Sequence, residues 1–182
     1  MLPPPRLVTL DDAPAIAALL RENREFLAPY EPRRPESYFT DVGQRTELAE
    51  VLAGHSAGTT VPYVVLAPTG EVAGRITLGG IVRGALLSGV LGYWVARRYT
   101  RQGLASAAVA HVVRTAFDEL GLHRLEAGTL VDNVASQAVL ARNGFERYGL
   151  APRYLRIAGR WQDHVLFQVL NPRLEDPAPV SS

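Results

Sequence analysis

The chain has 182 residues, 47% of them hydrophobic, which suits one compact domain, and no apolar stretch is long enough to span a membrane. The formal net charge of +1 gives no electrostatic reason to expect direct nucleic-acid binding.

The absence of cysteine excludes disulfides, thiolate metal sites and a cysteine nucleophile. All 19 basic residues are arginine, which excludes a lysine-bearing phosphate loop and a Schiff-base lysine. The four histidines lack metal-ligand spacing, so no metal is expected. The N-terminus lacks the pattern of a signal peptide, which makes a cytoplasmic location the expectation.

The first third of the chain is predicted to contain one short strand and two helices. The strand covers residues 6–10, and a helix follows with Asp11 as its cap and Pro14 in its first turn. Residues 23–35 mix aromatic, charged and proline residues and are expected to be irregular. Residues 36–52 are amphipathic and predict the second helix.

The middle of the chain is predicted to form three strands and a long helix. The strands cover residues 62–67, 72–82 and 86–96. The last two are joined by Arg83 and Gly84, which is typical of a hairpin. Apolar residues then recur on one face over residues 102–120, and Gly121 ends this helix.

The last third predicts a strand, a short helix and a hairpin. The strand covers residues 124–131, and the helix over residues 134–143 has Asn133 as N-cap. The hairpin strands are expected at residues 154–158 and 161–170. Residues 1–171 are therefore interpreted as a single domain, followed by a flexible proline-rich tail over 172–182. This order of elements is typical of a layered α/β sheet with helices on both faces.

The most informative segment is the passage from the third strand into the long helix, residues 91–106. A helix N-terminus presents free N–H groups and partial positive charge, so a pyrophosphate can bind there. Gly103 and Ala105 have little or no side chain, which allows phosphate oxygens to approach the backbone. Arginines at 97, 98 and 101 can add charge. The alternative is an ordinary strand-to-helix turn with solvated arginines.

A second element lies at the start of the short helix. Asn133 is its predicted cap, and Ser136 lies in its first turn. A ligand lying between the strand that ends near Val95 and the strand that ends near Val131 would meet the Ser136 hydroxyl. Helix capping alone also explains these residues, so a chemical role for Ser136 is a hypothesis at this point.

Together with several further segments, these two elements resemble GNAT acetyltransferases, and among them ribosomal-protein-alanine N-acetyltransferases of the RimJ/RimL type. The resemblance runs from about Arg6 to Leu170. It depends on the order and spacing of segments 23–32, 82–84, 91–93, 122–124, 133–136, 144–146 and 159–166. It implies a GNAT fold: a central mixed, mostly antiparallel sheet with helices on both faces. Its two parallel strands splay apart, often at a bulge.

The resemblance also implies acetyl-CoA as cosubstrate and assigns residues to it. The family's phosphate turn matches residues 100–105, where Gly103 and Ala105 agree with the pattern, Thr100 departs from it, and Arg101 stands where the family often has glycine. Backbone groups of one strand would pair with the pantetheine arm. The cofactor-binding residues implied are Tyr93, Trp94, Val95, Arg101, Gln102, Gly103, Leu104, Ala105, Ser106, Asn133, Ser136 and Asn143.

Without a cysteine, the simplest mechanism is direct attack of an amine on the thioester in a ternary complex. An α-amine titrates near 8, so an N-terminus needs only a mild general base. The candidate bases are Glu31, in the loop after the first helix, and Glu126, on the strand that leads to Asn133. Glu31 ranks first, because its aromatic and proline-rich loop can lie over the acceptor. Ser136, the other catalytic candidate, would donate a proton to the leaving thiolate. For both glutamates a solvated surface position is the alternative.

Other functions are compatible with parts of the sequence. The same fold can acetylate a small amine such as an antibiotic, or bind CoA without catalysis. Residues 54–58 match the Gly-x-Ser-x-Gly pattern of hydrolases, but that pattern needs a strand before Ser56 and a helix after it, and here the order is reversed. The expected acceptor is a protein N-terminus or a small amine, and the expected state is a monomer or a homodimer.

Overall fold

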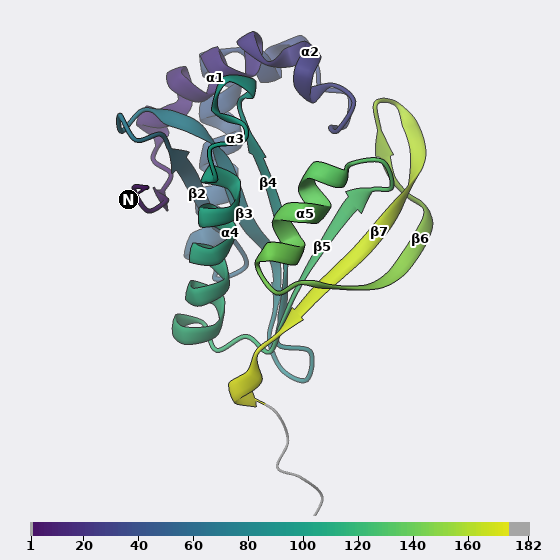
Figure 1. The fold of residues 1–182 in the computed structure, drawn as a ribbon. Coiled ribbons are helices and arrows are strands. Elements are labelled where there is room, and N and C mark those ends of the chain that lie inside the picture. The colour runs from purple at the N-terminus through teal and green to yellow at the C-terminus, as the bar shows by residue number, and fades with distance from the viewer. Residues whose placement is uncertain (1, 175–182) are drawn as a thin grey trace, which may run out of the picture.

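The computed structural model describes residues 2–174, and at its centre is a seven-stranded sheet in the order β1-β2-β3-β4-β5-β7-β6 (Figure 1). The strands are β1 Arg6–Leu7, β2 Val61–Leu66, β3 Val72–Val82, β4 Ser88–Val95, β5 Arg124–Leu130, β6 Glu146–Ile157 and β7 Arg160–Leu170. Only β4 and β5 run parallel, and every other neighbouring pair is antiparallel. The predicted mixed, mostly antiparallel sheet is therefore confirmed.

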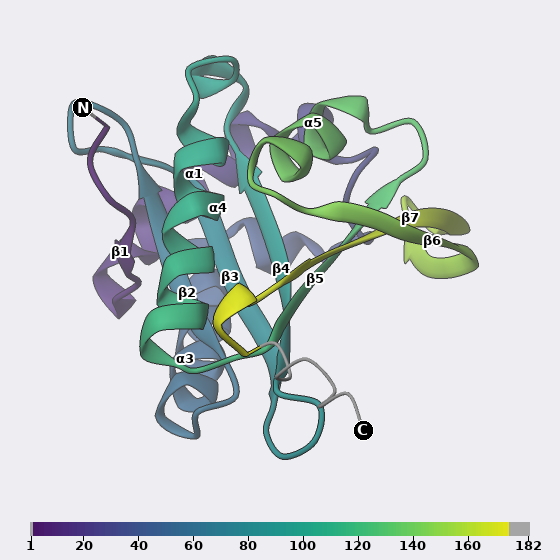
Figure 2. The same ribbon diagram turned by 60° about the horizontal axis from the view of Figure 1, so that its bottom comes forward.

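Helices cover both faces of this sheet, as predicted. The α-helices are α1 Ala13–Glu22, α2 Arg24–Leu27, α3 Asp41–Ser56, α4 Leu104–Arg114 and α5 Val134–Arg142. Short 3-10 helices lie at Leu10–Asp12, Glu36–Phe39, Arg97–Tyr99 and Pro172–Leu174, and a π-helical turn at Thr115–Glu119. α4 and α5 pack on one face, and α1 and α3 on the other (Figure 2). No helix among residues 2–174 is long and apolar enough to cross a membrane.

The two hydrophobic cores follow from the alternation of side chains along each strand. In β2, Tyr63 and Val65 point to the core that contains α4, whereas Val64 between them packs with Leu20 of α1 and Leu48 of α3. A buried strand of this kind is apolar on both faces, which is why β2 has no polar alternation in its sequence. The sheet therefore holds the two helical layers in fixed positions on either side of the parallel strand pair.

The parallel strands β4 and β5 separate after a short stretch of pairing. Their register contains three residue pairs, the last of which joins Val90 to Glu126. Beyond it β4 continues to Val95 along β3, while β5 continues to Leu130 along β7 (Figure 1). The predicted splay is present, but it contains no bulge. The register shift between β3 and β4 lies beyond Gly79 of β3, at the end of the sheet where β4 and β5 still pair. The backbone edges that face each other across this gap are open to a ligand.

Several predicted element boundaries were wrong at the N-terminal end. Asp11 does not cap the first helix, because a 3-10 turn precedes α1 and the cap of that turn is Thr9. The carboxylate of Asp12 accepts a hydrogen bond from the Thr9 backbone N–H at 2.8 Å and also pairs with Arg6. Residues 23–35 are not wholly irregular, since they contain the one-turn helix α2.

Three further elements differ from the predictions. The helix expected over 36–52 is divided at Thr40, whose hydroxyl accepts a hydrogen bond from the Gly43 N–H and caps α3. The helix expected over 102–120 begins at Leu104 and ends in the π-helical turn. β6 begins well before residue 154, because the pairing with β7 continues back to Glu146 across two register shifts. Of the tail predicted over 172–182, residues 175–182 lie outside the described part of the chain.

Candidate active site

The turn that leads into α4, residues 100–106, has a backbone shape that suits anion binding, and we call it the anion cradle. Arg101 and Gly103 both have positive φ, +61° and +79°, so the chain turns sharply before the helix begins. The backbone N–H groups of Gly103, Leu104, Ala105 and Ser106 have no hydrogen-bond acceptor among the described residues. Free N–H groups at a helix start bind phosphate oxygens, so this turn fits a diphosphate as the sequence predicts.

The side chains around this turn differ from expectation in one respect. Arg98 is directed away from the cradle, since its guanidinium forms an ion pair with Glu22 and stacks on Tyr99. Thr100 donates its hydroxyl to the Arg97 carbonyl at 2.8 Å, so it stabilises the turn itself. Arg97 and Arg101 are exposed and make no ion pair with any residue that the structure describes, so both guanidinium groups are free to bind an anion.

Asn23, the first residue of the segment 23–32, holds this turn against the end of α1, a role that its sequence neighbours do not indicate. It is only 2% exposed. Its Oδ1 accepts a hydrogen bond from the Arg97 backbone N–H at 2.7 Å, and its Nδ2 donates to the Leu19 carbonyl at 2.9 Å. A buried amide satisfied on both sides is strongly position-specific. The cradle is therefore tied to the helix that precedes the Glu31 loop.

A cleft of about 380 Å³ lies where β4 and β5 separate, and it collects five of the predicted site residues. They are Glu31, Tyr93, Trp94, Asn133 and Ser136. The cleft also contains residues that were not predicted, among them Tyr30, Arg34, Tyr38, Arg75, Thr129 and His164. Val95 and residues 101–106 are not part of its lining, since they belong to the end of β4 and the cradle.

Tyr93 and Ser136 are joined across the gap between β4 and α5. The Tyr93 hydroxyl lies 2.8 Å from Ser136 Oγ and donates to the Ser136 carbonyl at 3.2 Å. Burial raises the pKa of Tyr93 to about 12, so the phenol keeps its proton at neutral pH. Asn133 is the N-cap as predicted, because its Oδ1 accepts from the Ser136 N–H at 3.1 Å. The Ser136 hydroxyl thus faces a group that stays protonated.

Asn143 lies at the other end of α5, against the start of α4. Its Nδ2 donates to Ser106 Oγ at 3.1 Å and to the Val139 carbonyl at 2.8 Å. The structure therefore brings two of the residues predicted to bind cofactor, Asn143 and Ser106, into direct contact. They connect the cradle to the helix that carries Ser136.

Of the two candidate bases, only Glu31 lies in the cleft. Its loop is attached to the β6–β7 turn, where the Ala158 N–H donates to the Glu31 carbonyl oxygen at 2.9 Å. Burial raises the pKa of the Glu31 carboxyl, although the charges of Arg34 and Arg75 oppose this shift. Its carboxylate forms no ion pair within the described residues.

Glu126 does not lie at this site. Its carboxylate accepts a hydrogen bond from the Tyr148 hydroxyl at 2.6 Å and pairs with Arg124 at 3.3 Å. It is the residue at which β4 and β5 still pair, so it lies before the gap and outside the cleft. The hypothesis that Glu126 is the base is therefore not supported by its position.

Arg75 is the functional candidate that sequence reasoning missed. It lies on β3 between two buried residues, Gly74 and Ile76, and lines the cleft. Its Nε is buried without a hydrogen-bond partner among the described residues, as is Thr129 Oγ1 on β5. A single charged residue inside an otherwise uncharged strand was the signal in the sequence. Burying such a charge without a partner is costly, which is typical of a binding residue.

The hydrolase pattern around Ser56 is explained by helix geometry. Ser56 is the last residue of α3, and its hydroxyl donates to the Leu52 carbonyl at 3.1 Å. No strand enters this turn from the N-terminal side, so it is not a nucleophile elbow. Within residues 2–174, no group of three or more metal-ligating side chains could hold a metal ion.

Three features define the class of protein. They are the two splayed parallel strands, the cleft where these strands separate, and the anion cradle at the start of α4. The model of the acetyltransferase (GNAT) domain matches residues 6–146, and the chain belongs to this family of acetyltransferases. It is similar to the ribosomal protein uS5-alanine N-acetyltransferase of Escherichia coli, with 34% identity over 92% of this chain and 87% of that protein.

Two solved structures share the fold over nearly the whole chain. One is a ribosomal-protein-S5-alanine acetyltransferase from Vibrio fischeri, with TM-score 0.89 and 31% identity over 94% of each chain. The other is Mycobacterium smegmatis RimJ in complex with CoA-disulfide, with TM-score 0.88 and 32% identity over 97% of this chain and 90% of that one. The acetyltransferase prediction and its RimJ/RimL-type resemblance are confirmed.

Proposed function

We propose that this enzyme transfers an acetyl group from acetyl-CoA to the N-terminal α-amine of a protein, a ribosomal protein being the expected acceptor. The observation that carries the proposal is the cleft at the β4–β5 gap, which contains Glu31, Ser136 and the edge of β4 in one cavity. The relative from Escherichia coli is named for acetylating a ribosomal protein alanine, and RimJ from Mycobacterium smegmatis was solved in complex with CoA-disulfide.

The residues present fit a CoA-type cosubstrate at both ends. The free N–H groups of Gly103 to Ser106 suit the diphosphate, with exposed Arg101 beside them. The β4 edge from Tyr93 to Val95 has no strand partner on the β5 side, so its backbone can pair with the amides of the pantetheine arm. When bound, acetyl-CoA supplies the thioester carbonyl that the amine attacks. Backbone N–H groups on this edge would polarise that carbonyl.

Glu31 would accept the proton that the amine must lose. An α-amine has a pKa near 8, so a carboxylate whose own pKa is raised is a suitable partner at neutral pH. As the C–N bond forms and the C–S bond breaks, one proton leaves the amine for Glu31 and one is needed at the departing sulfur. Ser136 would donate the latter and recover a proton from solvent, while the protonated Tyr93 hydroxyl, 2.8 Å away, holds Ser136 Oγ in place.

Replacing Ser136 by Ala is expected to lower kcat about tenfold, or about 1.4 kcal/mol, because the thiolate loses its donor. The helix cap should survive, since Asn133 bonds the backbone N–H of residue 136. Steady-state kinetics with acetyl-CoA would measure the effect. Tyr93→Phe, which keeps the ring and removes the phenol, should change kcat in the same direction by less. An unchanged kcat in Ser136→Ala would remove this role.

The proposed function is tested by acetyl-CoA turnover against a panel of peptides and small amines, with mass spectrometry of the product. Acetylation of the α-amine in peptides with N-terminal alanine is the expected result. Modification of lysine side chains or small amines alone would contradict the N-terminal acceptor. CoA binding without turnover on any acceptor would instead indicate a non-catalytic binding protein.

A further inference from the structure

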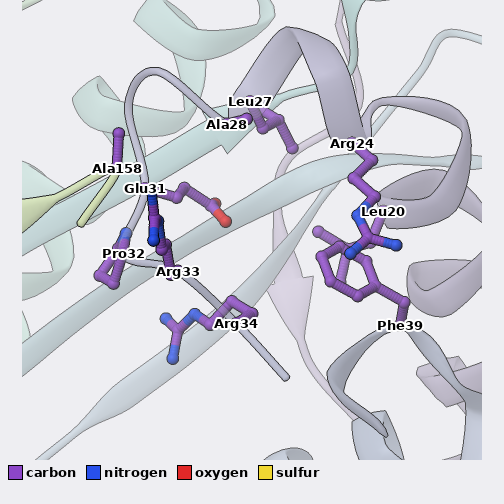
Figure 3. A pocket seen from close by; sticks show the side chains of 10 residues that line it. All are labelled: Leu20, Arg24, Leu27, Ala28, Glu31, Pro32, Arg33, Arg34, Phe39 and Ala158. Atoms are coloured by element: carbon purple, nitrogen blue, oxygen red, sulfur yellow. The ribbon is translucent and has the colours of Figure 1, made fainter. Parts of the chain in front are cut away.

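The acceptor side of the cleft adjoins a second cavity on the other side of the Glu31–Arg34 segment. This cavity has a volume of about 440 Å³ and shares Glu31, Pro32 and Arg34 with the cleft. Figure 3 shows the Glu31 carboxylate directed toward its middle, with arginine side chains around it. The remaining lining residues are Leu20, Arg24, Leu27, Ala28, Arg33, Phe39 and Ala158. Glu31 is therefore the one carboxylate among these lining residues.

Arg34 is the cation that both cavities share, and its charge is not neutralised. Its guanidinium carbon lies 4.5 Å from the centre of the Tyr38 ring, which holds the side chain in place. It has no carboxylate within 4 Å among the residues that the structure describes. Arg24 differs, because it pairs with Glu36. The Arg34 guanidinium is thus held in place by Tyr38 and is free to bind an anionic group of a ligand.

Arg75 adds a second unneutralised guanidinium, from the floor of the cleft. Its Nε is buried without a hydrogen-bond partner among the described residues, and it too forms no ion pair there. Desolvation lowers its pKa, although the charges of Tyr38, Glu47 and Glu31 act in the opposite direction. A carboxylate of the ligand would stabilise a guanidinium held in this way, because its two oxygens match the planar N–H donors.

We infer that Arg34 and Arg75 bind a carboxylate of the acceptor, so that preferred acceptors carry Asp or Glu within a few residues of the reactive amine. The inference rests on the proposed function, because it assigns the substrate class at the same cleft. Charge complementarity supports it. Arg34 and Arg75 line the cleft without an ion pair to any described residue. Glu31 is the one carboxylate in that lining, and Glu47, whose charge also acts on Arg75, lies outside it. Because Glu31 is engaged by the amine, one acidic group on the acceptor balances the remaining positive charge of the lining.

The test compares peptides with N-terminal alanine that carry Glu or Gln at position 2, 3 or 4 and are otherwise neutral and identical. At one of these positions kcat/KM is expected to be about tenfold higher for Glu, as for one charge-assisted hydrogen bond of about 1.4 kcal/mol. The difference should lie in KM, because the carboxylate binds away from the reacting atoms. Equal values of kcat/KM for Glu and Gln at every position would overturn the inference and leave the proposed function intact.

Arginine variants then locate the carboxylate site. Arg34→Gln and Arg75→Gln should each reduce the Glu-to-Gln preference toward one. Arg114→Gln is the matched control, since it removes the same charge from the exposed end of α4, outside both cavities, and should keep the preference. If Arg75→Gln does not fold, Arg34→Gln in the exposed loop decides the outcome. A preference that persists in Arg34→Gln would overturn the inference, and failure of every peptide would overturn the proposed function as well.

Discussion

Glu31→Gln is expected to lower kcat about a hundredfold at pH 7, because the amide cannot accept the proton of the attacking amine. The side chain keeps its size, so the cleft and the hydrogen bond between the Ala158 N–H and the residue 31 carbonyl should remain. The affinity for CoA should stay close to that of the wild type, since the cradle is formed by other residues. Steady-state kinetics with a peptide acceptor and calorimetric titration with CoA measure the two effects.

The pH profile separates a base from a merely structural glutamate. Burial raises the pKa of the Glu31 carboxyl, and only its deprotonated form accepts a proton. Wild-type kcat should therefore decrease as the pH falls through this raised pKa, at higher pH than for an exposed glutamate. In Glu31→Gln this limb should disappear. Glu126→Gln is the matched control and should keep both rate and profile. If it loses activity while Glu31→Gln does not, the assignment is wrong.

Gly103→Val is expected to raise the Kd for CoA about tenfold or more. Gly103 has a φ of +79°, which a β-branched residue avoids at a cost of about 1–2 kcal/mol. A Cβ there would meet only Leu2 Cδ1, at 3.9 Å, so the effect comes from the backbone and not from a clash. The turn relaxes, and its free N–H groups no longer converge on one anion. Calorimetric titration with CoA is the measurement.

The opposite end of the same helix region provides a matched control. Gly121 also has positive φ, +63°, and a Cβ there would meet nothing within 4 Å. Gly121→Val should lower the free energy of unfolding by a similar amount without changing the affinity for CoA. A truncated thioester that lacks the diphosphate should be affected much less by Gly103→Val than acetyl-CoA is. Equal loss for both would show that the turn does not hold phosphate.

Local sequence signals predicted much of the cofactor side. Asn133 predicted the N-cap that the structure contains, and the small residues at 103 and 105 predicted a backbone accessible to an anion, although Gly103 precedes α4 and does not lie inside the helix predicted over 102–120. Caps and turns are determined by residues that are close together in the chain, so they can be predicted from the sequence alone. The parallel pair and its splay were expected only through the family resemblance, because pairing between distant strands has no local signature.

The acceptor side could not be predicted in the same way, because its walls come from distant segments. Arg75 on β3 and His164 on β7 are far apart in sequence and meet only after the sheet has formed. Asn23 looked like a loop residue, and its importance depends on the backbone of Arg97, 74 positions away. Local pattern ranked Glu31 only slightly above Glu126, since the difference between them is their position relative to the gap, which depends on the folded sheet.

Backbone pairing joins β4 to β5 at one end of these strands only, and side-chain contacts such as that between Tyr93 and Ser136 connect the two sides across the gap. Residues of β3 and β4 line one wall of the cleft, and residues of β5, β6 and β7 line the other, while three backbone residue pairs connect β4 to β5. A cosubstrate arm lying in the gap sets the separation of the walls and so the width available to the acceptor. Thioester binding and acceptor affinity are therefore expected to be coupled.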